Sequence, residues 1–453
     1  MSVIKHTLIV SFFSILGNIH AWAQSANQDS IYVSENDSIQ KSTDSSKKGF
    51  SFGPLPVVAF DANKGFQYGA LLNIYDFGDG SYYPNVRQQW YIEASAYTKG
   101  SQQYVISYDS KHIIPQIRVS AAACLLVEKM LDFYGFNGYQ SYYDTDNNDA
   151  FYLMERIVPY FKTDLIGNII KDKVYWEAGY HLKWFGIDAL DKDNYNDSKS
   201  ESECFYGKTL YEKYQDWGII SKDEADGGWS SALRLGLIYD TRDFEPAPTK
   251  GIWAEAHAIV APKLLGTTKS YYQYSATFRQ YLPLNKDRLV FAYRLAYQGT
   301  IGNYAPFYVL PYYTYVGPGY DRDGFGGYRT VRGVLRNRVQ GLDVAFLNTE
   351  LRWKFFRTRI WKQDIYLASN LFLDGAVTTR DYNLSYHGAD NISLTSDYQI
   401  YVDKSKNDRH HFSAGTGLRI GINENFIIAI DYGHAFDKQD GGGALYINTG
   451  FLF

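Results

Sequence analysis

The sequence predicts an all-β protein, and within that class a 16-stranded antiparallel transmembrane β-barrel. Three observations lead to this prediction. From Phe50 onward, apolar residues alternate with polar or small ones, which is the period of a strand with one apolar face. The apolar segments are mostly about 9–13 residues long, as a tilted membrane-spanning strand requires. The chain has 42 tyrosines and 39 glycines, which suit a sheet with one wet face, one apolar face and many tight bends.

The composition excludes several other classes of protein. A mean hydropathy of −0.34 is too polar for a bundle of membrane-spanning helices. A charged fraction of 21% and an aromatic fraction of 17% are unlike those of a disordered chain. Two cysteines in 453 residues cannot form a disulfide framework. The net charge of −4 gives no electrostatic reason to expect a nucleic-acid partner.

The first 49 residues precede the predicted barrel. Lys5, an apolar stretch over 7–16 and the small residues Ala21 and Ala23 predict a signal peptide over residues 1–23. An anchored helix is the alternative, but the apolar stretch is too short to span a bilayer of about 30 Å. Residues 24–49 are polar and have no apolar period, so they are predicted to form a disordered periplasmic tether. The barrel is then expected over residues 50–453.

Each strand is placed by its alternation. The odd positions from 233 to 239 hold Leu, Leu, Leu and Tyr, while Arg234 and Asp240 fall on the other face. The same pattern recurs over 289–297, 412–420, 426–432 and 445–453. Sixteen strands are predicted to begin near residues 53, 65, 88, 101, 115, 150, 173, 230, 251, 270, 287, 342, 364, 410, 425 and 443.

A soluble β-sandwich would show the same alternation, so further features are needed to favour the barrel. Charges and glycines on the polar faces suit a barrel lumen, and aromatic residues near strand ends suit a membrane interface. These aromatic residues are Trp90, Tyr97, Trp176, Trp184, Tyr271 and Tyr272. An exported chain without a spanning helix can place such a sheet in the outer membrane, because closure pairs every backbone group.

The connections between the predicted strands differ in length. Turns at 63–65, 99–100 and 423–425 are short, whereas the stretches 128–149, 188–229, 300–341 and 379–409 are long. We expect the short turns at the periplasmic end of the barrel and the long loops outside. A short helix is expected over 209–217 within one of the long loops.

The stretch before the twelfth predicted strand contains the most specific motif in the chain. It runs Gly326-Gly327-Tyr328-Arg329-Thr330-Val331-Arg332-Gly333-Val334, and Asn348-Thr349-Glu350-Leu351-Arg352 follows. This stretch resembles the BamA/TamA superfamily of outer-membrane assembly and transport barrels, also called the bacterial surface antigen family. The family hallmark is an Arg-Gly pair between an aliphatic and an aromatic residue, in an extracellular loop that folds back into the barrel. The resemblance therefore implies an infolded extracellular loop, with Val334 in the aromatic position.

Other segments carry the same resemblance. Asp240-Thr241-Arg242-Asp243 resembles the family's turn after the eighth strand, and Phe133-Tyr134-Gly135-Phe136-Asn137 resembles a loop signature. Phe372-Leu373-Asp374-Gly375 resembles a motif of the thirteenth strand, with its glycine one residue early. Phe453, with Phe451 facing outward, resembles the end signal of barrels inserted by the assembly machine. Family members usually carry periplasmic polypeptide-transport-associated domains before the barrel. Residues 24–49 are too few to form one such domain, so this chain is predicted to be a barrel-only member.

The resemblance and the alternation together define a first candidate site. The loop-lock motif consists of Val331, Arg332, Gly333 and Val334. Alternation places Glu350 and Asp374 on lumen-facing sides of their strands, within reach of a guanidinium fork that binds two carboxylates in fixed geometry. Glycine at 333 would let the backbone turn against the wall. The alternative is an ordinary surface arginine on an extracellular loop.

The seam between the first and last strands is the second candidate site. Gly53, Pro54 and Pro56 lie in the first strand, where proline cannot donate to a ladder, and Gly450 lies near the end of the last strand. These residues predict a short closing pair. In the family this seam admits a client strand or disturbs lipid, and the resemblance implies the same here. The alternative is a first strand that simply begins late.

Three functions remain as hypotheses. The first is protein insertion or translocation, or lipid handling, through the weak seam; the second is a structural barrel or passive pore constricted by the infolded loop. The third, a membrane-embedded hydrolase, would need a serine beside His257, which shares a polar wall with Glu255. We expect no enzymatic activity, no metal and no cofactor. The expected partners are outer-membrane lipids, other outer-membrane assembly subunits and client barrel proteins, in the outer membrane of a Gram-negative bacterium.

Overall fold

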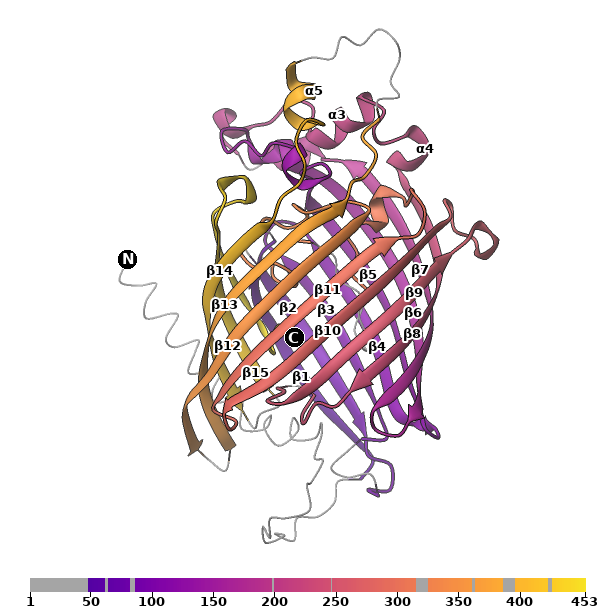
Figure 1. The fold of residues 1–453 in the computed structure, drawn as a ribbon, viewed down its shortest axis with the longest axis vertical. Helices are drawn as coiled ribbons and strands as arrows, with labels where there is room; N and C mark the ends of the chain where they lie inside the picture. The colour runs from indigo at the N-terminus through magenta and orange to yellow at the C-terminus, as the bar shows by residue number, and fades with distance from the viewer. Residues whose placement is uncertain are drawn as a thin grey trace.

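Sixteen antiparallel strands form one closed barrel (Figure 1). Each strand pairs with its neighbours in sequence, and β1 pairs with β16. This topology confirms the predicted fold class. The computed structural model describes residues 48–61, 64–81, 86–197, 199–245, 247–314, 325–360, 363–385, 396–422 and 426–453. The predicted signal peptide, nearly all of the predicted tether and the predicted turn at 423–425 lie outside these ranges.

Every strand begins within three residues of its predicted start, because the two-residue period is strong in each of them. The strands are β1 (Phe50–Asp61), β2 (Gly65–Asp76), β3 (Gln88–Tyr97), β4 (Gln102–Ile114), β5 (Ile117–Asp132), β6 (Leu153–Ile170), β7 (Val174–Ala189), β8 (Gly227–Asp240), β9 (Gly251–Ala261), β10 (Tyr271–Asn285), β11 (Leu289–Thr300), β12 (Asp343–Ile360), β13 (Gln363–Arg380), β14 (His411–Ile422), β15 (Phe426–Ala435) and β16 (Gly443–Thr449).

Short helices lie in the connections. The helices are α2 (Lys192–Asn196), α3 (Leu210–Asp216), α4 (Lys222–Ala225) and α5 (Ser396–Tyr401), and the 3₁₀ turns are η2 (Gly138–Gln140), η3 (Asp149–Tyr152), η4 (Glu201–Glu203), η5 (Lys263–Leu265), η6 (Phe307–Val309) and η7 (Lys438–Asp440). The predicted helix over 209–217 is confirmed as α3, where Thr209 and Glu212 form a capping box. Among the residues described, no helix combines the length and the apolar character that crossing a bilayer requires.

The barrel wall is apolar outside and polar inside. On β8, Leu233 and Leu235 are 42% and 56% exposed, whereas Arg234 between them is 1% exposed. This order is the reverse of a water-soluble protein, and it suits a wall whose outer solvent is hydrocarbon. The lumen is therefore the place where buried charges gather.

The long connections lie at one end of the barrel, but the prediction for two short turns is wrong. In an antiparallel barrel every odd-to-even connection lies at the same end. The turns between β1 and β2 and between β3 and β4 therefore lie with the long loops, at what we call the loop end. The even-to-odd connections form the opposite end, the turn end. The length of a connection therefore does not determine the end of the barrel at which it lies. That end depends on whether the connection follows an odd-numbered or an even-numbered strand.

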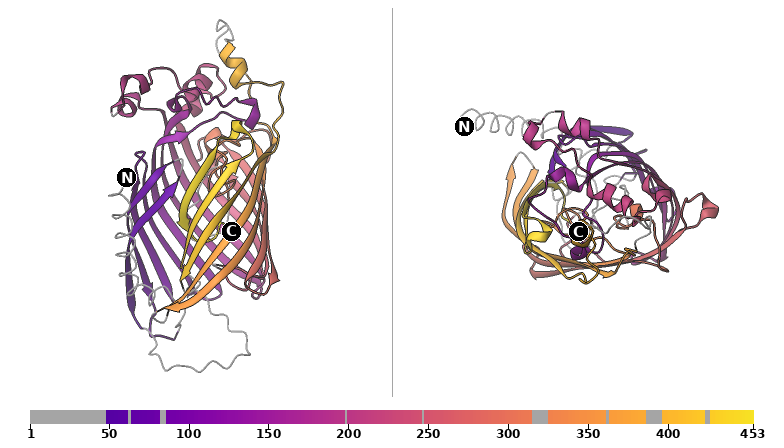
Figure 2. Two further views of the ribbon diagram at one scale, coloured as in Figure 1. Left: turned by 90° about the vertical axis from the view of Figure 1, so that its left-hand side faces the viewer. Right: turned by 90° about the horizontal axis from the view of Figure 1, so that it is seen from above.

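The short helices and turns of the long loops lie together at the loop end (Figure 2). Their side chains form an aromatic layer there, which we call the loop cap. Its centre consists of Phe133, Phe136, Tyr211, Tyr214 and Phe307, all at most 2% exposed. The rings of Phe133 and Tyr214 meet edge to face, with centroids 5.3 Å apart. Aromatic pairs in this geometry contribute more stabilisation than their buried area alone would give. The layer is therefore a packed core rather than a set of open loops.

The barrel closes through a short seam. β1 pairs with β2 through twelve residue pairs but with β16 through two, Phe60 with Ile447 and Asp61 with Tyr446. Both pairs lie at the loop end of β1. β16 ends at Thr449, so within the described residues the ladder between β1 and β16 does not extend toward the turn end.

The prediction that Phe451 faces outward is wrong. The chain leaves the wall at Gly450, whose φ is 81°, and residues 450–453, the C-terminal segment, enter the lumen. Phe451 packs against the lumen-facing residues Tyr366 and Ile427. The guanidinium carbon of Arg352 lies 4.4 Å from the centre of the Phe451 ring. The lumen thus offers this ring both apolar packing and a cation.

Candidate functional site in the barrel lumen

The connection between β11 and β12 folds back into the lumen, and we call its residues 325–342 the infolded loop. Arg332 lies on it with a fully buried side chain. Its Nε and Nη2 donate to the two carboxylate oxygens of Asp374 at 2.8 and 3.0 Å, and its Nη1 donates to Glu350 at 2.6 Å. The backbone N–H of Arg332 also donates to Asp374, at 3.1 Å. The structure therefore brings the predicted arginine against both predicted carboxylates.

These three groups belong to a larger cluster of buried charges. Arg352 Nε donates to the second oxygen of Glu350 at 2.7 Å. Arg419 donates twice to Asp431, at 2.9 Å each, and Arg332 Nη1 lies 3.8 Å from Asp431. The lumen charge cluster consists of Arg332, Arg352, Arg419, Glu350, Asp374 and Asp431, all at most 4% exposed. Equal numbers of cations and anions offset the cost of removing each charge from water.

The guanidinium of Arg332 also packs against the ring of Phe372. The guanidinium carbon of Arg332 lies 3.6 Å from the centre of the Phe372 ring. Phe372 and Asp374 are two residues apart on β13, so alternation places both side chains in the lumen. The predicted Phe372–Gly375 motif thus provides a cation–π contact and a carboxylate for the same guanidinium.

The tip of the infolded loop touches β15 backbone to backbone. Gly333 has a φ of 89°, and a Cβ on it would lie 2.6 Å from the carbonyl carbon of Gly433. A Cβ on Gly433 would lie 2.8 Å from the carbonyl carbon of Arg332. The N–H of Gly333 donates to the hydroxyl of Tyr446 on β16 at 3.2 Å. Glycine is needed on both sides of this contact, because neither backbone can move away without breaking the cluster.

Replacing Gly433 with alanine is expected to displace the loop tip. The added methyl group meets backbone atoms rather than a flexible side chain, and such overpacking costs about 1–3 kcal/mol. We expect faster proteolytic cleavage within residues 325–342 of the folded barrel, measured by mass spectrometry of timed digests. Gly442→Ala is the matched control, since no atom lies within 4 Å of that Cβ position. Equal cleavage rates in the two variants would contradict the close contact.

The two valines of the loop-lock motif are buried in an apolar cluster. Val331 and Val334 are 0% and 1% exposed and pack in the same cluster as Phe325 and Phe346. Asn348 Nδ2 donates to the carbonyl of Thr330 at 2.6 Å, just before the motif. Aromatic packing at the tip therefore comes from neighbouring phenylalanines, although Val334 occupies the position where the family has an aromatic residue.

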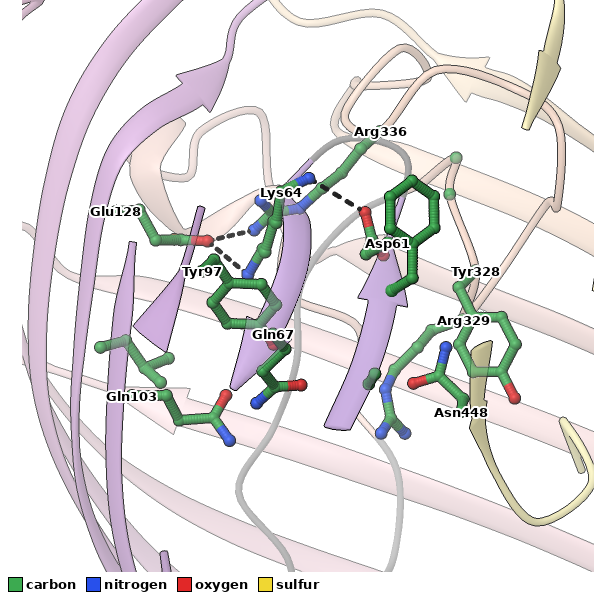
Figure 3. A pocket seen from close by; sticks show the side chains of 15 residues that line it. Asp61, Lys64, Gln67, Tyr97, Gln103, Glu128, Tyr328, Arg329, Arg336 and Asn448 are labelled. Carbon is green, nitrogen blue, oxygen red and sulfur yellow. Dashed lines mark hydrogen bonds and ion pairs between the residues drawn. The ribbon is translucent and has the colours of Figure 1, made fainter. Parts of the chain in front are cut away.

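A second ionic contact ties the infolded loop to the first hairpin (Figure 3). Arg336 Nη2 donates to Glu128 on β5 at 2.6 Å, and Lys64, between β1 and β2, lies 2.8 Å from the same oxygen. Arg156 Nε donates to the other oxygen of Glu128 at 3.0 Å. A cavity of about 70 Å³ lies beside this group, lined by the infolded loop and by the loop-end residues of β1 and β2. Glu128 thus connects the infolded loop to the strands of the seam.

A third contact ties the infolded loop to the loop cap. His411 lies between two carboxylates, with Nδ1 2.6 Å from Asp440 and Nε2 3.0 Å from Asp408. Arg338 of the infolded loop lies 3.6 Å from the same oxygen of Asp440. Burial opposes ionisation of Asp408, but hydrogen bonds from His411 and from two backbone amides outweigh it and lower the pKa of Asp408 to about 2.

Arg352 holds the C-terminal segment inside the lumen. Its Nη2 donates to the backbone oxygen of Phe453 at 2.7 Å, and its guanidinium carbon lies 4.9 Å from the Phe453 ring. Phe453 is 9% exposed and packs with Tyr281 and Ala292. Because Arg352 also donates to Glu350, one side chain contacts both the lumen charge cluster and the C-terminal segment.

The structure places all four predicted seam residues on the turn-end side of the two closing pairs. Gly53, Pro54 and Pro56 lie in the part of β1 beyond the two seam pairs, and Gly450 follows the end of β16. The alternative of a first strand that begins late is wrong, because β1 begins at Phe50 and pairs with β2 along its whole length. The seam is short because β16 ends early and because its continuation turns inward.

Three members of the lumen charge cluster were not predicted as site residues. Arg352, Arg419 and Asp431 fall on polar strand faces, so alternation alone signals that they face the lumen. Their pairing follows from register, which the pattern does not contain. Asp431 lies opposite Gly417, and Arg419 lies opposite Ala429, so the ion pair is diagonal across two strands.

The serine that the hydrolase hypothesis requires is present beside His257. Ser275 Oγ lies 3.3 Å from His257 Nδ1, and Glu177 Oε2 lies 2.8 Å from His257 Nε2. All three side chains are at most 4% exposed, and Arg234 already donates to Glu177 at 2.5 Å. The cavity beside the infolded loop is lined by other residues. Packed side chains therefore enclose this group, and a substrate could reach it only by displacing them.

The fold and the lumen define a class of protein: a transmembrane β-barrel with a short seam and an infolded loop that carries a buried arginine. The model of the Omp85 superfamily domain matches residues 138–453, which is more than half of the chain. The chain belongs to the Omp85 superfamily, and this finding confirms the resemblance inferred from the Arg332-Gly333 pair. Barrels of this superfamily are outer-membrane proteins.

Two solved structures illustrate the shared fold. BamA from Haemophilus ducreyi lacking POTRA domains 1–3 is 15% identical, with a TM-score of 0.53, over 89% of this chain and 70% of that chain. CdiB from Escherichia coli is 10% identical, with a TM-score of 0.53, over 89% of this chain and 63% of that chain. At these identities the likeness concerns the fold alone, and this chain spans about two thirds of either length. The curated proteins contain no match.

Proposed function

We propose that the chain acts in the outer membrane of a Gram-negative bacterium, inserting or translocating other polypeptides or handling lipid through its seam, together with a partner protein. The turn end would face the periplasm and the loop end the outside. The observation that carries this proposal is the two-pair ladder between β1 and β16. A wall that opens anywhere should open where the fewest backbone hydrogen bonds must break.

The strength of the other ladders supports this choice of site. Across the described residues, every other pair of neighbouring strands is joined by at least seven residue pairs. A net contribution of about 0.5–1.5 kcal/mol for each hydrogen bond makes the seam the weakest junction by several kcal/mol. Pro54 and Pro56 add to this weakness, because a proline nitrogen cannot donate to any strand that pairs with β1.

Closing the seam covalently is expected to abolish function. Phe60→Cys with Ile447→Cys places two cysteines in a directly opposed pair, so oxidation should join β1 to β16. The measurement is the folding of a small urea-unfolded outer-membrane β-barrel into vesicles that contain the purified chain. We expect accelerated folding with the reduced protein, the empty-vesicle rate with the oxidised protein, and recovery on reduction.

A disulfide within a long ladder is the matched control for this experiment. Ala345→Cys with Val377→Cys joins β12 to β13, which already pair along most of their length. This bridge should leave the folding rate unchanged in either redox state. Full acceleration by the oxidised 60/447 variant would rule out seam opening.

The passive pore is the runner-up function, and the loop cap argues against it. The infolded loop fills the lumen with the charge cluster, and the loop cap adds a packed aromatic layer. We expect purified chain in planar bilayers to show no large, steady conductance. A stable channel of porin size would favour the pore over the seam. Deleting residues 325–342 should create such a channel if the infolded loop is what blocks the lumen.

The proposed function is not enzymatic. The Ser275, His257 and Glu177 group is enclosed, and Arg234 holds the carboxylate that would have to assist the histidine. We attribute these contacts to stabilisation of the wall between β7 and β10. Phospholipid hydrolysis by the purified chain that disappears in Ser275→Ala would contradict this assignment.

A further inference from the structure

The hairpin of β12 and β13 extends beyond the strand beside it at the turn end. β11 begins at Leu289, and its ladder with β12 ends at the pair Leu289 and Trp353, with one further bond from Lys354 N–H to the Arg288 carbonyl at 2.8 Å. β12 continues to Ile360. Residues 355–360, which we call the overhang, extend about 20 Å along the strand. Figure 1 shows this hairpin reaching below the turn between β10 and β11.

The overhang has one backbone edge that no described strand covers. On one side it pairs with β13, from Phe356 opposite Leu367 to Ile360 opposite Gln363. On the other side, within the described residues, β11 does not reach it. A β-strand edge of this length is a ready template for another extended chain, and proteins normally cover or charge such edges.

The two faces of the hairpin differ in chemistry. Trp353 and Phe356 face outward and are 54% and 50% exposed, as expected for side chains at the membrane boundary. Lys354, Arg357 and Arg359 lie opposite Ala368, Tyr366 and Asp364, which places these three cations on the lumen side. Asp364 of β13 lies on the same side, with a carboxylate oxygen 3.9 Å from Arg357 Nη2.

We propose that the overhang binds an extended, acidic segment of a periplasmic protein by strand addition. Because these cations face the mouth of the barrel and not the bilayer, we favour a protein segment over lipid headgroups as the occupant. Backbone pairing supplies affinity and the two arginines supply charge complementarity. The proposal rests on the proposed function, since it gives the partner at the periplasmic face a docking site distant from the seam.

The test uses the full chain in lipid nanodiscs and two synthetic probes. One is an eight-residue peptide of alternating glutamate and valine with a fluorophore, and the other has lysine in place of glutamate. Fluorescence anisotropy gives affinity, and amide hydrogen exchange gives the position of binding. We expect the acidic peptide to protect the amides of residues 355–360 and to bind at least about tenfold more tightly than the basic one.

Charge-reversal variants complete the experiment. Arg357→Glu with Arg359→Glu should weaken the acidic peptide about tenfold or more. Lys171→Glu with Lys173→Glu, two exposed cations of the distant turn between β6 and β7 at the same end of the barrel, should not. Protection at residues 50–59 in place of the overhang, equal binding of both peptides, or unchanged binding in the first variant would overturn the proposal. The oxidised 60/447 variant should bind the peptide normally, so failure of the seam and failure of this site give different results.

Discussion

Replacing Arg332 with alanine is expected to lower the stability of the barrel more than any other single substitution in the infolded loop. The change leaves Asp374 buried without the guanidinium that donates to it and takes from Glu350 one of its two arginines. It removes three side-chain hydrogen bonds and a cation–π contact. Breaking a buried ion pair from one side costs about 3–5 kcal/mol. The measurement is unfolding in urea from lipid vesicles, together with the temperature at which the compact band is lost on gels.

A surface arginine provides the matched control for this prediction. Arg409 donates to Asp437 at 2.5 Å, but its side chain is 65% exposed, so water replaces the lost bond. Arg409→Ala should therefore cost less than about 1 kcal/mol. An Arg332→Ala barrel that unfolds at the same urea concentration as the Arg409→Ala barrel would refute a structural role for the buried arginine.

Much of the fold could be predicted because the strand period is local. Whether Leu235 or Arg234 faces outward depends only on alternation within β8, and the period identifies the start of each strand. The contacts of Arg332 could be anticipated for a similar reason. Alternation places Glu350 and Asp374 in the lumen, and the family hallmark places the arginine on a loop that enters it.

The features that could not be predicted depend on distant parts of the chain. Phe451 would face outward if β16 continued in register, but the strand ends at Thr449 and the positive φ of Gly450 turns the chain inward. That turn is favoured by Arg352, a residue about a hundred positions earlier. The pairing of Arg419 with Asp431 likewise depends on register between β14 and β15. A pattern along one segment carries no information about such partners.

Replacing Arg352 with alanine is expected to release the C-terminal segment from the lumen. The substitution removes the hydrogen bond to the backbone oxygen of residue 453 and the cation beside the Phe451 ring. The measurement is maleimide labelling of Phe453→Cys in vesicles, which should become at least about tenfold faster, since hydrogen bonds to charged groups contribute about 1.5–3 kcal/mol. Arg409→Ala should leave labelling unchanged. Slow labelling in both variants would show that packing alone holds the segment.

The same substitution tests whether the infolded loop and the C-terminal segment are energetically coupled. Arg332 and Arg352 donate to different oxygens of Glu350, so each cation remains when the other is removed. Removing both leaves Glu350 without either arginine, and the double variant should therefore lose about 1–3 kcal/mol more than the sum of the single losses. This excess should disappear in a Glu350→Gln background, where no carboxylate needs neutralising. Additive losses with Glu350 intact would mean that the two arginines act independently, and that displacement of the infolded loop cannot alter the seam through this carboxylate.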